Sequence, residues 1–333
     1  MTREAAPAKL VFCGTPRFAV PTLEALRAAG HEIALVVSQP DRPVGRGGQL
    51  TAPPVKLAAL AAGLAVTQPE KIRDNAEFRA QLEAIAPDAI VVVAYGHLIP
   101  PWMLALPRLG CVNLHASLLP RYRGAAPIQW AVAMGELFTG NTTMLLEEGL
   151  DTGPILLQQA LAIAPRQTAA ELFDVLAEGG APLVVNTLAG LADGSLQPKP
   201  QNHAGATIAP LLSREDGRME FAAHTATELK NRWRGFQPWP GAFTAFAGKK
   251  LIVHRMEVAG APGAEESEPV TPASGEDASM RPGRIRIKGH RLFVACAQKT
   301  WLELVEVQLE GKKRLTAAEF LRGITLPANA RLG

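Results

Sequence analysis

Short apolar runs alternate with amphipathic helical patterns through the first 200 residues, and this alternation constrains the fold more than any other feature of the sequence. Strand-like runs stand at 10–13, 33–37, 89–95, 112–115 and 142–146. Such alternation is typical of βαβ units on a mostly parallel sheet. The run at 89–95 is continuously apolar, which predicts a central strand buried on both faces. We therefore expect an α/β fold.

Helical spacing fills the gaps between these strands. The segment 74–85 carries apolar side chains three and four residues apart, and we expect Asp74 and Glu77 to cap its start. A longer helix is expected to run from about 168 towards 190, opening with a Thr-x-x-Glu capping box.

A change of composition divides the chain. The segment 193–212 loses periodicity and gains Pro, Gly, Gln and Asn, which predicts a linker between a catalytic domain over 1–192 and a second domain over 213–333. The second domain has one helical segment, 225–234, followed by short strand-like runs broken by turns. These runs are 243–246, 251–254, 283–287, 291–295 and 302–307. The pattern favours a small OB-like β-barrel.

The net charge of +3 is unevenly distributed. Residues 1–200 hold 15 Lys and Arg against 17 Asp and Glu, whereas residues 201–333 hold 19 against 14. Six of those 14 acids lie in 257–280, which has no basic residue and is rich in Pro, Ala, Ser and Gly, as expected of a solvated insertion. The rest of this part is strongly basic, so it favours a nucleic-acid partner over a merely soluble cationic surface.

Several other classes of protein are excluded or disfavoured. The apolar stretch 89–106 is interrupted by Gly, His and Pro and falls short of the roughly 20 apolar residues of a membrane helix, so we expect no membrane contact and a cytoplasmic location. The three cysteines, Cys13, Cys111 and Cys296, lack C-x-x-C spacing and are expected to be buried thiols. The turn after the first strand, 14–19, lacks two glycines of the dinucleotide fingerprint, which disfavours nicotinamide cofactors, and no P-loop is present.

The densest cluster of chemically active residues follows the strand at 112–115. Asn113 and His115 are two residues apart, so they share one strand face at the end where open α/β sheets bind ligands. An amide donor beside an imidazole can stabilise an oxyanion and manage a proton, as acyl transfer to an amine requires. A purely structural histidine is the alternative that spacing alone leaves open.

An acidic loop, Glu147-Glu-Gly-Leu-Asp-Thr-Gly153, follows the next predicted strand. Asp151 could orient His115 and accept the proton that an attacking amine loses. Asp-Thr-Gly is also an ordinary turn. The aspartic-protease interpretation is rejected, because a single copy offers no second carboxylate to share the proton.

The run from Asn113 to Gln129, with Gly-Leu-Asp-Thr-Gly at 149–153, resembles the core of the formyltransferases that use 10-formyltetrahydrofolate. Two further stretches, Gln-Pro-Asp-Arg-Pro-Val-Gly-Arg-Gly at 39–47 and Phe-Gln-Pro-Trp-Pro at 236–240, are similar to the members of this family that act on initiator methionyl-tRNA. The resemblance covers about 8–325. It implies a Rossmann-like transferase domain and an OB-like domain that binds tRNA. The implied activity is transfer of the formyl group to the α-amino group of methionine on initiator methionyl-tRNA, for translation initiation.

The resemblance also implies roles for single residues. It assigns catalysis to Asn113, His115 and Asp151; contact with the folate to Ser117, Leu118, Leu119 and Pro120; and contact with tRNA to Phe18, Arg42 and Arg46. We expect a monomer that needs no metal. Two departures stand out: Glu147 replaces the usual Asp, and the loop reads Gly-Gly-Gln-Leu at 47–50 where some relatives carry Lys, which weakens the expected grip on phosphate.

Other functions stay open at this level. The acceptor could be a sugar-nucleotide amine or a purine precursor, although the basic second domain argues against the purine. A protein of another class, one that binds RNA without catalysis, would keep salt-sensitive tRNA binding after loss of His115.

Overall fold

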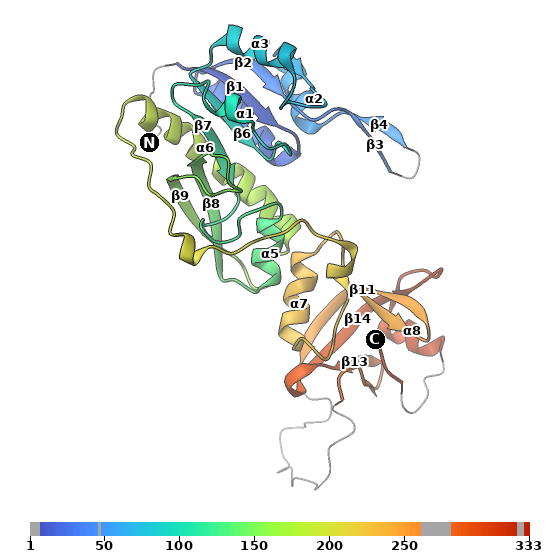
Figure 1. The fold of residues 1–333 in the computed structure, drawn as a ribbon. Helices are drawn as coiled ribbons and strands as arrows, with labels where there is room; N and C mark the ends of the chain where they lie inside the picture. The colour runs from blue at the N-terminus through green and yellow to red at the C-terminus, as the bar shows by residue number, and fades with distance from the viewer. Residues whose placement is uncertain (1–6, 46–47, 261–280, 325–329) are drawn as a thin grey trace. The chain divides into compact units, whose positions relative to one another are not determined.

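The computed structural model describes residues 7–45, 48–260, 281–324 and 330–333. The chain forms two compact units (Figure 1). The first unit comprises Met1–Ile128, Leu137–Ala164 and Glu171–Leu211, and the second comprises Gln129–Glu136, Pro165–Ala170 and Leu212–Gly333. Most of the expected acidic insertion, 261–280, lies outside the described residues.

A seven-stranded sheet, in the order β5-β2-β1-β6-β7-β8-β9, forms the centre of the first unit. Its strands are β1 Lys9–Gly14, β2 Glu32–Val37, β5 Val66–Thr67, β6 Ala89–Val93, β7 Cys111–His115, β8 Phe138–Leu145 and β9 Ile155–Ala162. The strands from β5 to β7 are parallel, and β8 and β9 add on in antiparallel fashion. The mostly parallel α/β sheet is thus confirmed. Strand β9 was not predicted, because Ile-Leu-Leu-Gln-Gln-Ala-Leu-Ala has little β-branched character.

Helices cover the sheet. They are α1 Val20–Ala28, α2 Pro54–Ala61, α3 Ala76–Ile85, α4 Pro101–Leu104 and α6 Ala169–Ala192. Phe78 and Leu82 of α3 pack with Val92 of β6 in one hydrophobic cluster. The predicted cap of α3 is wrong by one residue: Asn75, not Asp74, accepts the Phe78 N–H at 3.0 Å. An amide oxygen one residue nearer the helix reaches the free N–H, as is usual at an N-cap.

Helix α6 is long and apolar enough to span a membrane by length and composition, the one such helix among the residues described. More than half of its apolar stretch is buried inside the protein. Asn141 of β8 donates from Nδ2 to the Leu176 carbonyl at 2.8 Å, and Thr143 contacts Thr187 at 2.7 Å between hydroxyl oxygens. These contacts are those of a core helix packed on β8.

The segment 193–212, expected to be a linker, belongs almost entirely to the first unit. After α6 the chain returns along β9 (Figure 1), where Lys199 and Ile155 exchange two backbone hydrogen bonds of 2.8 Å. Further on, the Arg123 N–H donates to Thr207 O at 2.8 Å and the Ala209 N–H donates to Arg123 O at 2.7 Å. Backbone pairing of this kind needs no apolar periodicity, so the sequence pattern did not reveal it.

No strand was predicted in the region 39–50. It contains two short strands instead, β3 Arg42–Val44 and β4 Gln49–Thr51, which pair antiparallel as a separate two-stranded sheet (Figure 1). The turn residue Gly45 has φ +74°, a conformation that glycine adopts without steric cost.

The second unit is built on an antiparallel sheet in the order β10-β11-β14-β13-β12, with β15 paired to β14. Its elements are α7 Ala226–Gly235, β10 Phe243–Phe246, β11 Lys249–Ala259, β12 Ile285–Lys288, β13 Arg291–Ala295, β14 Trp301–Leu309, β15 Leu315–Thr316 and α8 Ala317–Arg322. The pairing path ends at β10 and β12, so among the described strands the sheet is a half-barrel. The small β-barrel domain expected here is confirmed as an antiparallel half-barrel. Helix α8, with its capping box of Thr316 and Glu319, was not predicted.

The core of the second unit predicts a stability effect. Leu304 of β14 is fully buried between Met256 and Leu292 of the adjacent strands. We expect Leu304→Ala to lower the free energy of unfolding of this unit by about 2–5 kcal/mol, because it removes apolar contacts and leaves a cavity. Urea denaturation followed by tryptophan fluorescence would measure it. The control Ile287→Ala, at a position 46% exposed, should cost much less, and equal effects would contradict the assignment of the core.

Candidate active site

The two chemically active residues of β7 lie on the face of the sheet opposite α6. Leu114, between them, points towards α6: a Cβ added to Gly180 would stand 2.6 Å from Leu114 Cδ2. Since side chains alternate along a strand, Asn113 and His115 point to the other face. Both are buried, with 8% and 6% of their surface exposed.

The ring of His115 is oriented by a backbone carbonyl. Nε2 lies 2.9 Å from Tyr122 O, and because a carbonyl can only accept, Nε2 carries a proton. Nδ1 faces Asp151 Oδ2 at 3.7 Å, which is too long for a hydrogen bond but within the range of an ion pair. Nδ1 is therefore the nitrogen that can gain or lose a proton, and its protonated form faces a carboxylate.

Asp151 reaches this position on a tight loop between β8 and β9. Its backbone has φ +50°, in the left-handed region, and its Oδ2 accepts the Gly124 N–H at 2.8 Å. A Cβ added to Gly153 would lie 1.9 Å from Leu145 O, so a residue with a side chain cannot stand there without moving the loop. Glu147, which departs from the family pattern, accepts the Thr152 hydroxyl at 2.6 Å and so stabilises the turn.

In the segment expected to contact folate, two of the four residues are buried and form hydrogen bonds within the protein. Ser117 is fully buried and donates from Oγ to Arg121 O at 2.7 Å. Leu119 is 3% exposed, and its N–H donates to Thr142 Oγ1 at 3.2 Å. Leu118 and Pro120 are half-buried. Contact with folate through this segment stays a prediction, and these two half-buried side chains have the surface for it.

Of the three residues expected to contact tRNA, the structure describes two, and these two differ in exposure. Phe18 is 4% exposed, and its ring packs edge-to-face on Phe173 of α6 at 5.1 Å between centroids, which leaves little surface for another molecule. Arg42 begins β3, is exposed, and pairs with Glu70 at 3.2 Å. Arg46 lies outside the described residues. A tRNA contact by any of them stays a prediction.

The sequence did not indicate two buried polar residues that contact the loops of the candidate site. Arg123 and Gln201, each 6% exposed, join the loop after β7 to the Asp151 loop through hydrogen bonds. Arg123 stood inside the motif run, where its burial was not foreseen, and Gln201 stood in the segment interpreted as a linker. A polar side chain in a segment without periodicity gives no sequence signal of burial.

The cysteines fit their expected role as buried thiols. All three are buried and unpaired. Burial raises the pKa of Cys111 and of Cys296 to about 12, so both stay protonated and unreactive near neutral pH. In the part of the chain that the structure describes, no group of three or more His, Cys, Asp and Glu side chains is arranged to hold a metal ion.

An amide, an imidazole and a carboxylate near the carboxyl edge of an α/β sheet define a group-transfer enzyme suited to acyl transfer. The model of the "Formyl transferase" family matches residues 8–188, and that of the "Formyl transferase, C-terminal domain" matches 211–325. The chain belongs to the formyl transferase family, as its motifs predicted.

Named relatives are similar over almost the whole chain. The "Methionyl-tRNA formyltransferase" of Acidobacterium capsulatum is 63% identical over 325 residues, covering 98% of this chain and 99% of the relative. The protein of the same name from Koribacter versatilis is 55% identical over 97% of this chain and 98% of its own length. Among solved structures, the N-formyltransferase from Helicobacter canadensis, in complex with folinic acid and dTDP-3-aminofucose, has a TM-score of 0.62. It is 15% identical and covers 89% of this chain and 98% of that one, which shows a common fold alone.

Proposed function

We propose that this enzyme transfers the formyl group of 10-formyltetrahydrofolate to the α-amino group of methionine on initiator methionyl-tRNA, for the initiation of translation. The observation that carries the proposal is the 63% identity, over 98% of the chain, to a relative named for this activity. The site supports it, because its groups suit attack of an amine on a formyl carbon.

In this proposal each of the three side chains has one task. Asn113 donates a hydrogen bond to the formyl oxygen as negative charge develops on it, and His115, protonated on Nδ1, adds a second positive group. Asp151 stabilises the imidazolium and accepts the proton that the attacking amine loses, directly or through water. The proton then passes to the folate nitrogen as the bond between that nitrogen and the formyl carbon breaks, and tetrahydrofolate leaves. The tautomer imposed by Tyr122 O leaves Nδ1, the nitrogen nearest Asp151, for this exchange. The reaction needs no covalent intermediate on the protein.

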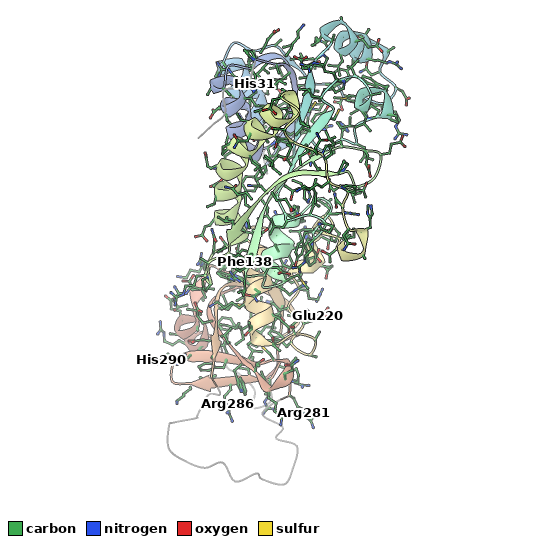
Figure 2. All side chains as sticks on the ribbon, turned by 90° about the vertical axis from the view of Figure 1, so that its left-hand side faces the viewer. His31, Phe138, Glu220, Arg281, Arg286 and His290 are labelled. Atoms are coloured by element: carbon green, nitrogen blue, oxygen red, sulfur yellow. The ribbon has the colours of Figure 1, made fainter. Side chains whose placement is uncertain are left out.

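Basic residues of the second unit support a nucleic-acid substrate. Figure 2 shows Arg281, Arg286 and His290 at the same end of this unit. They lie before, within and after β12, and all three are exposed. Phosphate binding by Lys and Arg supplies most of the affinity of such surfaces. We propose that this end of the half-barrel contacts tRNA, that the protein acts as a monomer, and that it works in the cytoplasm, where translation begins.

The 39–50 hairpin provides a test of the acceptor. The exposed Arg42–Glu70 pair contributes little to stability, so Arg42 can exchange Glu70 for a phosphate group. We expect Arg42→Gln with Arg46→Gln to raise the KM for charged initiator tRNA about tenfold, roughly 1.4 kcal/mol. The KM should also depend less steeply on salt concentration, because fewer phosphate groups are neutralised. The assay is formylmethionine formation at several salt concentrations, with the KM for the folate as internal control.

The same assay separates the rival acceptors. Turnover of a sugar-nucleotide amine, with no formylmethionine and no effect of the two arginine substitutions, would replace the proposed acceptor. Binding of tRNA without any formyl transfer would point to a protein that binds RNA without catalysis.

A further inference from the structure

Gln201 is a buried side chain. Apart from a 4.0 Å contact of Nε2 with Met144 Sδ, its hydrogen bonds go to Arg123 and to the turn that carries Asp151. Its Nε2 lies 2.8 Å from Asp151 O and 2.7 Å from Gly153 O, so one amide group donates to two carbonyls of the same turn. A primary amide has two N–H protons, one for each carbonyl. The side chain therefore holds the turn that carries the Asp151 carboxylate.

Arg123 determines which way this amide points. Its Nε and one terminal nitrogen donate to Gln201 Oε1 at 3.1 and 2.6 Å. A guanidinium can only donate, so Oε1 must face Arg123 and Nε2 must face the turn. The same terminal nitrogen lies 3.1 Å from His203 Nδ1, which must then accept. The backbone of Arg123 is itself paired with Thr207 and Ala209.

Asp151 is thus held at two points by neighbouring residues of one loop. Gly124 donates its N–H to the carboxylate, and Arg123, through Gln201, fixes the carbonyl. Asp151 has a left-handed φ of +50°, a conformation that aspartate tolerates better than most residues but that still costs free energy, and the two contacts help to maintain it.

The chemistry of the Arg123–Gln201 pair argues against a purely structural role. Arg123 is a buried cation, and the acceptors Gln201 Oε1 and His203 Nδ1 are both neutral. Removing a charge from water is costly, and apolar residues of similar volume usually stabilise a fold as well or better. What a guanidinium and an amide provide, and apolar packing does not, is a defined orientation.

We infer that Gln201, oriented by Arg123, is a positioning residue that fixes the Asp151 carboxylate opposite His115 Nδ1. The inference rests on the proposed function in that Asp151 then serves formyl transfer. Gln201 itself touches no reacting atom; it acts through the turn, so its removal should lower turnover while substrate binding is kept.

Gln201→Glu separates positioning from scaffolding. The new carboxylate strengthens the contact with Arg123, but it places an oxygen where Nε2 donated to two carbonyls, which repels the turn. If Gln201 served only to stabilise the fold through its contact with Arg123, the enzyme would tolerate this change. We expect kcat to fall about 100-fold, as displacements near 1 Å cause, with KM for both substrates within about threefold. The matched control is Gln197→Glu, the same change at an exposed site where Nε2 donates to Gly194 O.

Amide hydrogen exchange would detect the loosening of the Asp151 turn independently of catalytic activity. We expect faster exchange in peptides that cover 121–126 and 147–153 of Gln201→Glu, including the Gly124 amide that Asp151 accepts, and unchanged exchange in the second unit. In a double-mutant cycle with Asp151→Asn, the effect of Gln201→Glu on kcat should largely disappear, because both changes disable one group.

The inference about Gln201 and the proposed function can fail separately. Wild-type exchange in 147–153, turnover within about threefold of wild type, or additive effects in the cycle would each overturn the inference. If the wild-type enzyme makes no formylmethionine, the proposed function fails, and hydrogen exchange alone then decides whether Gln201 holds the turn. If Gln201→Glu does not fold, Gln201→Met, which keeps the volume and loses both donors, takes its place in the same measurements.

Discussion

Asn113→Ala is expected to lower the turnover of formyl transfer by about 100- to 1000-fold, the usual cost of removing an oxyanion donor. The side chain is 8% exposed in the middle of β7, two residues before His115, so its loss removes the amide without opening a large core. The charge on the formyl oxygen would then lose a donor that was in place before the reaction. Steady-state kinetics with charged initiator tRNA, together with the affinity for the folate, measures the effect.

Folate affinity should stay within a few fold, because Asn113 acts on charge that develops only as the bond forms. The control Asn186→Ala removes the same side chain from an exposed position on α6 and should leave turnover unchanged. Near-normal turnover of Asn113→Ala would remove this residue from the mechanism and leave His115 as the main stabilising group.

Asp151→Asn should reduce turnover by about 100-fold or more, in line with the contribution of a general acid or base. The amide keeps the shape of the carboxylate, and its oxygen can still accept the Gly124 N–H, so the turn should stay in place. What disappears is the negative charge 3.7 Å from His115 Nδ1 and the group that accepts the amine's proton. Single-turnover kinetics would separate this loss in the chemical step from any change in binding.

The matched control is Asp74→Asn, an exposed carboxylate outside the site, for which wild-type turnover is expected. If Asp151→Asn kept its turnover but bound folate poorly, Asp151 would belong to substrate binding, and the proton would have to leave by another route.

The positions of most strands, and which of their side chains are buried, could be predicted from the sequence, because apolar periodicity reflects which side chains face the core. The continuous run at 89–95 contains the fully buried β6, Ala89–Val93, and Asn113 and His115 both lie buried in β7. The hairpin at β3 and β4, strand β9 and the Asn75 cap were not foreseen. Their sequences carry weak propensities, and the choice between neighbouring polar residues depends on backbone geometry.

For this protein the sequence alone was sufficient to establish the α/β class, the basic second part and the family, and to propose Asn113, His115 and Asp151 as the site, since motifs and periodicity are local patterns. Only the tertiary structure showed that His115 Nε2 is tied to Tyr122 O, that Phe18 is packed on Phe173, and that Gln201 holds the Asp151 turn. Each of these contacts joins residues distant along the chain or depends on the direction of a single N–H. Such contacts leave no periodic trace, because their partners are decided by how the loops meet in the folded protein.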